Sequence, residues 1–276
     1  MPKGSPDRAS PNVQLRYADS GAEETPLAGD IVLVHSSDVH VDHHYTPKLF
    51  DGDGTGSLRA VLNAARKARA DIVLLAGDTF DCHRLPDALL ETTASVIREF
   101  DIPVVILPGN HDPAVEEAVF HHRAFSGLEC LSVIGVTHEE AVHFAQLDLE
   151  VWGRPHRDYS DMDPFENPRP RSTRWQVAMG HGHYTPAPDR STRLRPSWLI
   201  GDDELNATGA DYVALGHWNR WVKVGSGPVE AWYSGSFDYA QSVNVVRLVA
   251  GSGVQVTRVP LELPDNFSRF NPGQSA

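Results

Sequence analysis

The chain has 276 residues, of which 41% are hydrophobic and 22% are charged, and its formal net charge is −13. This composition is typical of a globular protein, and no apolar run approaches the roughly 18 residues of a membrane-spanning helix, so we expect no membrane partner. The negative charge disfavours loose, sequence-independent binding to nucleic acid. Only two cysteines are present and the start lacks an apolar signal segment, which together favour a cytoplasmic location.

Three parts of the chain differ in composition. Residues 1–29 are rich in Pro, Ser, Gly and charge, and they predict a flexible N-terminal arm. Residues 30–265 carry regular apolar patterns and predict a single domain. Residues 266–276 predict a polar tail.

The first half of the predicted domain alternates strands and helices. Segments 31–35, 72–76 and 104–107 are almost wholly apolar, which is typical of parallel strands covered on both faces. Between them, apolar residues at helical spacing predict one helix capped by Ser57 and a second helix at about Asp87–Phe100. The order strand, helix, strand, helix, strand indicates an α/β protein.

The second half contains short segments, many of them alternating, which predict further strands. A sandwich of two mixed sheets is therefore favoured over a simple doubly wound sheet. The loop over residues 153–174 is too long for a mere connector, and it predicts a substrate-side loop or a partner surface. The predicted strands lie near residues 131–134, 141–144, 148–152, 175–179, 212–215, 229–233, 243–249 and 254–259.

Five short polar segments follow apolar runs, at the ends of predicted strands. Each alone is a turn or cap more often than a ligand, but together they offer carboxylate, imidazole and amide groups without thiolate, which suit divalent cations such as Mn²⁺, Fe, Zn²⁺ or Mg²⁺. Open α/β sheets place ligand sites at the carboxyl ends of strands, so we expect the five segments to converge. They are Asp38-Val39-His40, Gly77-Asp78-Thr79-Phe80-Asp81, Gly109-Asn110-His111-Asp112, Gly180-His181 and Gly216-His217-Trp218-Asn219.

The spacing within the segments indicates how ligands could be arranged. Asp38 and His40 stand two apart, so an extended chain points both side chains to one side. Asp78 has two oxygens that can bridge two cations. Asn110 supplies an amide oxygen. His181 and His217, which end later strands, complete the ligand set of a second ion.

This series resembles the motifs of the calcineurin-like metallophosphoesterase superfamily, namely Asp-x-His, Gly-Asp-x-x-Asp, Gly-Asn-His-Asp/Glu, His and Gly-His-x-His. The resemblance implies a four-layer α/β/β/α sandwich with two mixed β-sheets, and two divalent metal ions. It places one ion on Asp38, His40, Asp78 and the position of Asn219, and the other ion on Asp78, Asn110, His181 and His217.

Asn219 departs from the family pattern, which has a histidine at this position. An amide oxygen is a weaker ligand than an imidazole nitrogen. The ion held by Asp38, His40 and Asp78 is therefore expected to bind less tightly or to be a harder ion, with Mn²⁺ favoured. A rival alignment takes residues 180–183 as the Gly-His-x-His motif, with His183 in the last position. That alignment leaves residues 211–217 unexplained, and we prefer the first.

The resemblance also implies a catalytic group. His111 is expected to face the leaving oxygen as general acid, with Asp112 orienting it, while Asp81 is expected to support a ligand or cap a helix. Six histidines without motif support are expected at the surface, namely His83, His121, His122, His138, His143 and His156. Four residues that flank the last two segments could contact substrate, namely His183, Tyr184, Trp218 and Arg220.

Three functions are compatible with this pattern. The first is a nuclease-type phosphodiesterase acting on DNA, because residues 211–217 and 233–236 look most like the nuclease subunit SbcD of bacterial DNA-repair exonucleases. Arginines of the 153–174 loop would line the approach and an SbcC-like ATPase would be the partner, although no room remains for the capping domain expected of SbcD. The second is a phosphodiesterase or phosphatase acting on a small nucleotide. The third is a non-catalytic metal-binding scaffold, against which the retained His111 and Asp112 speak.

Overall fold

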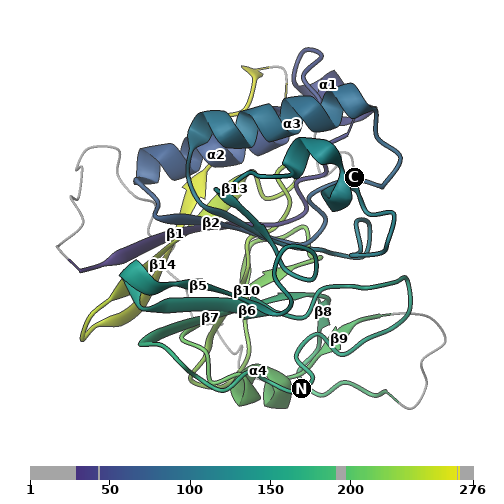
Figure 1. The fold of residues 1–276 in the computed structure, drawn as a ribbon. Coiled ribbons are helices and arrows are strands. Elements are labelled where there is room, and N and C mark those ends of the chain that lie inside the picture. The colour runs from purple at the N-terminus through teal and green to yellow at the C-terminus, as the bar shows by residue number, and fades with distance from the viewer. Residues whose placement is uncertain (1–28, 43, 191–196, 266, 268–276) are drawn as a thin grey trace, which may run out of the picture.

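Two mixed β-sheets of six strands each form the centre of the protein (Figure 1). The structure, a computed structural model, describes residues 29–42, 44–190, 197–265 and 267. The first sheet has the order β14-β13-β1-β2-β3-β4 and the second has the order β11-β12-β10-β7-β6-β5. The predicted α/β sandwich of two mixed sheets is confirmed.

The first sheet is built from four parallel strands with an antiparallel pair added at one edge. Two long helices cover its outer face, as the upper layer in Figure 1 shows. The strands are β1 (Ile31–Ser36), β2 (Ile72–Ala76), β3 (Val104–Leu107), β4 (Leu131–Val133), β13 (Ser242–Val249) and β14 (Gly253–Pro260), and the helices of this half are α1 (Thr46–Leu49), α2 (Gly56–Ala68) and α3 (Asp87–Phe100).

The second sheet has four parallel strands at its centre and an antiparallel strand at each edge. Its strands are β5 (Ala141–Phe144), β6 (Leu149–Gly153), β7 (Trp175–His181), β10 (Tyr212–Gly216), β11 (Val222–Val224) and β12 (Glu230–Tyr233). The remaining elements are a strand pair, β8 (His183–Tyr184) and β9 (Leu199–Ile200), the helix α4 (Asp202–Ala207), and three short 3-10 turns at Val119–His121, Arg123–Phe125 and Ala145–Leu147.

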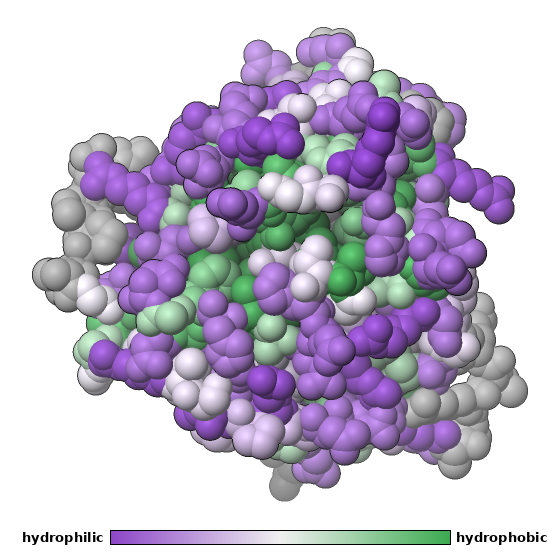
Figure 2. Space-filling model, in the orientation of Figure 1, coloured by the Kyte–Doolittle hydropathy of each residue, from purple (hydrophilic) through white to green (hydrophobic). Residues whose placement is uncertain are grey.

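The fourth layer is thin, because one short helix and one long loop cover the outer face of the second sheet. Leu205 of α4 and Phe165 of the 153–174 loop are both buried in the apolar cluster on this face. The loop that was predicted to serve substrate or partner thus packs as part of the fold. In Figure 2, hydrophobic surface on the side shown is concentrated in a band between the hydrophilic outer layers.

The two sheets pack against each other through one apolar core. Leu33 and Leu74 of the first sheet and Val151 and Met179 of the second are fully buried in one cluster. Complete burial of such side chains stabilises the fold by about 1.5–3 kcal/mol each. No helix within the described ranges is long and apolar enough to cross a bilayer.

Two local predictions need correction. Ser57 is not a helix cap: α2 begins at Gly56, Thr55 occupies the cap position, and Ser57 is buried inside the helix. The turn that starts α2 is instead organised by Asp53, whose Oδ1 accepts a hydrogen bond from the Thr55 amide at 2.8 Å. Phe267, assigned to the polar tail, is buried near Phe237. Residues 1–28 of the predicted arm lie outside the described residues.

A polar network crosses between the two sheets at His35 of β1. Its Nδ1 lies 2.8 Å from the hydroxyl oxygen of Tyr212 on β10, and Asn244 of β13 donates to the same hydroxyl at 3.2 Å. Trp221 donates to Asn244 at 2.7 Å. His35 is fully buried, and burial lowers its pKa from 6.5 to about 3 despite the opposing effect of the Leu215 backbone carbonyl.

We expect His35 to make stability depend on pH. The unfolded chain takes up a proton near pH 6.5 whereas the folded chain resists it down to about pH 3, so the contribution of His35 is complete above pH 6.5 and is lost as pH falls. The loss amounts to about 1.4 kcal/mol of unfolding free energy per pH unit within this window. Urea unfolding at several pH values should show a shallower slope for His35→Gln than for the wild type, and parallel slopes would contradict the assignment.

Candidate metal centre

The loops that follow β1 and β2 lie side by side and are strained. The Asp38 amide donates to the Gly77 carbonyl at 3.0 Å, and the His40 amide donates to the Asp78 carbonyl at 3.1 Å. Asp38, His40 and Asp78 have φ angles of 51°, 46° and 52°, and His217 has a φ of 99°. Such left-handed conformations cost about 1–3 kcal/mol for residues other than glycine and are found preferentially at functional sites. The sharp bends direct these four side chains toward one centre.

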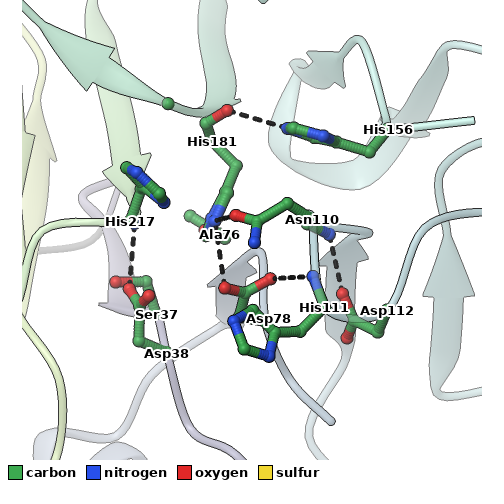
Figure 3. A network of polar contacts seen from close by, with 12 residues as sticks. Ser37, Asp38, Ala76, Asp78, Asn110, His111, Asp112, His156, His181 and His217 are labelled. Atoms are coloured by element: carbon green, nitrogen blue, oxygen red, sulfur yellow. Dashed lines mark hydrogen bonds and ion pairs between the residues drawn. The ribbon is translucent and has the colours of Figure 1, made fainter. Parts of the chain in front are cut away.

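Two groups of side chains at this centre share Asp78. Figure 3 shows Asp78 with Asp38, Asn110, His181 and His217 around it. Ligand atoms of Asp38, His40 and Asp78 all lie within 4.8 Å of one another, and so do those of Asp78, His181 and His217. Asn110 joins the second group, because its Oδ1 is 3.0 Å from His181 Nε2. The structure thus brings six of the seven predicted ligands together.

His181 is oriented in the way usual for a metal ligand. Its Nδ1 lies 2.9 Å from the Ala76 carbonyl oxygen, so Nδ1 carries the hydrogen and Nε2 faces Asp78 Oδ2 at 3.2 Å. In Figure 3 the ring reaches from β7 to a position between Asp78 and Asn110. Gly77 makes room for it, since a Cβ at this position, where φ is +89°, would lie 2.0 Å from His181 Nδ1.

The charge balance of the centre favours bound cations. Asp38, Asp78 and Asp112 are 4%, 2% and 0% exposed, and in the described part of the chain no lysine or arginine forms an ion pair with them. Burial raises the pKa of Asp38; for Asp78 burial acts in the same direction, but His181 keeps its pKa well below the usual range. Buried carboxylates without a lysine or arginine partner, beside imidazole and amide groups, fit two divalent cations.

Metal binding is expected to release protons. Burial alone would lower the pKa values of His40 and His181, but Asp81 for His40 and Asp78 for both raise each pKa to about 9. Each ring therefore holds an extra proton near neutral pH in the metal-free protein and must lose it to act as a ligand. Calorimetry at about pH 7.5 in buffers of different ionisation enthalpy should show about two protons released as the sites fill with Mn²⁺, and affinity should fall as pH falls. A binding enthalpy independent of the buffer would contradict this.

His111 lies at the open side of the centre beside Asp81. Its backbone amide donates to Asp78 Oδ1 at 2.9 Å, and its Nδ1 lies 3.1 Å from the carbonyl oxygen and 3.8 Å from Oδ1 of Asp81. Asp81 Oδ1 also lies 3.2 Å from His40 Nδ1. Asp81 therefore contacts both a candidate ligand and the candidate acid. Its place three residues after Asp78 was the sequence signal for this position.

Asp112 was expected to orient His111, but the structure gives it different contacts. It is fully buried, and its two oxygens accept hydrogen bonds from the amides of Gly109 at 2.7 Å and Phe80 at 3.0 Å. Its carboxylate thus ties the loop after β2 to the loop after β3, while Asp81 is the carboxylate next to the His111 ring. Burial, with the charge of Asp78, raises the pKa of Asp112 to about 6.

The last motif divides between the centre and the surface. His217 lies in the second ligand group, whereas Asn219 is exposed and its carbonyl oxygen accepts from the Ser236 amide at 3.3 Å. Its role as a ligand remains a prediction. His183, the ligand in the rival alignment, is exposed, and its Nδ1 accepts from Trp218 Nε1 at 3.0 Å.

His156 was predicted to be a surface residue, and this is wrong. It is 1% exposed, and its Nε2 donates to the carbonyl oxygen of His181 at 2.9 Å. Its own amide donates to the Pro108 carbonyl at 3.2 Å, which ties it to the loop after β3. Burial, with the charge of His181, lowers its pKa to about 4. The sequence feature that could have indicated this position is that His156 comes just after β6. This strand pairs in parallel with β7, which ends at His181.

The arginines of the 153–174 loop are largely engaged within the fold. Arg154 pairs with Glu166, Arg169 pairs with buried Glu150 at 2.8 Å, and Arg171 pairs with Asp211 at 2.7 Å. These pairs fasten the loop over the second sheet. Arginines of this loop were expected to line an approach to the centre. These three are instead held in ion pairs within the fold.

A mixed α/β/β/α sandwich that gathers carboxylates, histidines and an amide at its strand ends defines a metal-dependent phosphoesterase type of protein. The chain belongs to the calcineurin-like phosphoesterase family, which it matches over residues 31–220. This family binds divalent metals in a dinuclear site, and the two groups around Asp78 are the candidate ligands here.

Comparison with individual proteins agrees with this family. The chain is 26% identical over 217 residues to the metallophosphoesterase YhaO of Bacillus subtilis (strain 168). The aligned region covers 68% of this chain and 48% of YhaO. It thus spans about half the length of this relative. One solved crystal structure has a TM-score of 0.53 at 10% identity, covering 85% of this chain and 99% of the other. A candidate 5′-nucleotidase of Staphylococcus aureus has a TM-score of 0.50 at 12% identity, covering 85% of this chain and 54% of the other. These structures share the fold.

Proposed function

We propose that this protein is a two-metal hydrolase of phosphodiester bonds. The observation that carries the proposal is the pair of ligand groups sharing Asp78, with His111 beside them. When bound, two divalent cations would supply the Lewis acidity that activates water and neutralises the phosphate oxygens. Membership of the phosphoesterase family supports the same reaction class.

Each ligand group would hold one cation. Asp38, His40 and Asp78 would hold the first, with Asn219 as a weaker oxygen donor, and Asp78, Asn110, His181 and His217 would hold the second. A donor set of oxygen and imidazole nitrogen without sulfur suits Mn²⁺, which is our proposed metal, with Fe, Zn²⁺ and Mg²⁺ as alternatives.

His111 would provide the proton for the leaving oxygen. Its Nδ1 faces the Asp81 carbonyl at 3.1 Å and therefore keeps its hydrogen there, which leaves Nε2 for the substrate. Asp81, whose side chain lies close to the ring, would hold the ring in this orientation for the transfer. General acid catalysis of this kind contributes about 10²–10⁴-fold to the rate.

Two diesters are candidates for the natural substrate. DNA is supported by the two stretches that resemble SbcD, and this alternative brings an SbcC-like ATPase as partner. A small nucleotide is supported by the net charge of −13 and by the internal ion pairs of the loop arginines. A pocket of about 720 Å³ beside His217 has room for a nucleotide or for one end of a strand.

A panel of Mn²⁺-dependent assays tests the proposal. It compares bis-p-nitrophenyl phosphate, p-nitrophenyl phosphate, cyclic nucleotides, and single- and double-stranded DNA, with His111→Ala as the control variant. DNA degradation that is lost in His111→Ala would favour the nuclease. Absence of turnover for every diester, in protein that binds the metal, would overturn the proposal and favour the non-catalytic scaffold.

A further inference from the structure

The pocket beside His217 joins the candidate metal centre to a second set of side chains. Its volume is about 720 Å³, and its wall includes His217, Trp218, Arg220, His183 and Tyr239. This volume lies within the range of small-molecule sites. Because His217 belongs both to the wall and to a ligand group, a molecule in the pocket could also place a phosphate at the centre.

Trp218 offers a fixed aromatic surface to this pocket. Its ring stacks on Tyr233 with centroids 4.6 Å apart and an angle of 12° between the planes. Tyr233 is buried, and its hydroxyl donates to the Gly182 carbonyl at 2.7 Å and accepts from the Tyr184 amide at 3.0 Å. The indole is thus held in place before any ligand arrives, and aromatic surfaces of this kind bind nucleobases by stacking.

His183 offers a hydrogen-bond donor. Its Nδ1 accepts the Trp218 indole hydrogen at 3.0 Å, so the neutral ring carries its own hydrogen on Nε2. His183 is exposed at the pocket wall. The Nε2 hydrogen can therefore be donated to a carbonyl or phosphate oxygen of a ligand.

Arg220 offers a positive charge that the fold does not use. It is exposed, and among the residues that the structure describes it has no carboxylate within ion-pair distance, unlike Arg169 and Arg171. Arginine binds phosphate through two parallel hydrogen bonds, which makes it selective for that group. In a chain with a net charge of −13, a free arginine at this wall is a local exception.

The backbone of this wall is built by a close approach of two loops. Gly235 has a φ of +76°, and a Cβ there would lie 2.7 Å from the Asn219 carbonyl oxygen and 2.9 Å from the Arg220 carbonyl carbon. Only glycine permits this contact, which the Ser236 amide reinforces by donating to Asn219 at 3.3 Å. The packed loops keep the backbones of Arg220 and of the loop that carries Tyr239 in a fixed relation.

From these contacts we propose that the pocket selects the substrate by binding a nucleoside next to the scissile phosphate, with its base on Trp218 and a further phosphate on Arg220. The inference rests on the proposed function, because the scissile phosphate must lie at the metal centre. The same chemical unit occurs in a free nucleotide and at the end of a nucleic-acid strand, and the test separates these sources.

Three diesters with one leaving group provide the test: methyl p-nitrophenyl phosphate, thymidine 5′-(p-nitrophenyl phosphate), and the latter with a 3′-phosphate. With Mn²⁺, kcat/KM is expected to rise about tenfold or more at each step along this series. Arg220→Ala should remove the second step and Trp218→Leu should reduce the first. The control Arg98→Ala, at an exposed position on α3, should keep both steps.

The outcomes separate the two proposals. If the wild type hydrolyses none of the three diesters, the proposed function fails. If it hydrolyses methyl p-nitrophenyl phosphate but gains nothing from the added groups, or if Arg220→Ala keeps the second step, this inference alone is overturned. Extension of the 3′-phosphate to oligothymidylate distinguishes the sources: a further rise in kcat/KM identifies a strand end as the bound form, and no rise identifies a single nucleotide.

Discussion

Replacement of Asp78 by Asn is expected to reduce diester hydrolysis by at least about 10³-fold and to lower the metal content from two ions per chain to one or none. Asp78 is the side chain shared by the two ligand groups that are proposed to hold the cations. Its Oδ2 lies 3.2 Å from His181, and its Oδ1 accepts the His111 amide at 2.9 Å. An amide can offer one oxygen but not two, and it carries no charge to attract a cation.

Metal analysis and kinetics on the same samples measure both effects of Asp78→Asn. Asp203→Asn is a suitable control, because Asp203 is an exposed carboxylate on α4, outside both ligand groups. We expect this control to retain two ions and wild-type turnover. An Asp78→Asn protein that keeps both ions and most of its activity would show that the centre is not organised around this carboxylate.

His111→Ala is expected to lower kcat by about 10²–10⁴-fold while leaving the metal content at two ions per chain. The ring contacts Asp81 at the open side of the centre and belongs to neither of the two groups around Asp78. The loss should be larger for a diester with a nucleoside as leaving group than for bis-p-nitrophenyl phosphate, because p-nitrophenolate needs little protonation to depart. An equal loss for both substrates would argue against a general acid.

Two carboxylate variants show which acid supports His111. Asp81→Asn should reduce turnover of the nucleoside ester more than that of the p-nitrophenyl ester, as expected for a residue that acts through His111. Asp112→Asn should instead lower the unfolding free energy by about 1–3 kcal/mol, because an amide cannot accept from both the Gly109 and Phe80 amides. The reverse pattern would restore the sequence-based expectation that Asp112 orients the ring.

Long apolar segments were predictable because their pattern agrees with their burial. The predicted limits of 72–76, 104–107 and 141–144 are those of β2, β3 and β5, and the predicted limits of α3 are also observed. Short elements such as β8, β9 and α4 carry too few residues to show a period, and contacts with the rest of the fold determine them. Ser57 was misassigned because α2 already begins at Gly56, after a turn in which Asp53 accepts a hydrogen bond from the Thr55 amide.

The site was predictable as a set of residues and less so as a set of contacts. Strand-end placement was enough to bring Asp38 and Asp78 together, because β1 and β2 are parallel neighbours in one sheet. His181 joins them from the end of β7 in the other sheet, so its position depends on how the two sheets pack. Which carboxylate faces His111 depends on left-handed backbone at Asp78 and on the packing of two loops, and neither can be derived from spacing. His156 reaches His181 only through the pairing of β6 with β7, which links residues that are far apart in the sequence.

The most direct test of the central claim is anomalous diffraction from crystals of the protein loaded with Mn²⁺. We expect two peaks that share Asp78, one beside Asp38 and His40 and the other beside Asn110, His181 and His217. Asn219→Ala should reduce the occupancy of the first peak, whereas His183→Ala should leave both unchanged. A single peak, or a peak held by His40, Asp81 and His111 in place of these two, would contradict the two-metal assignment.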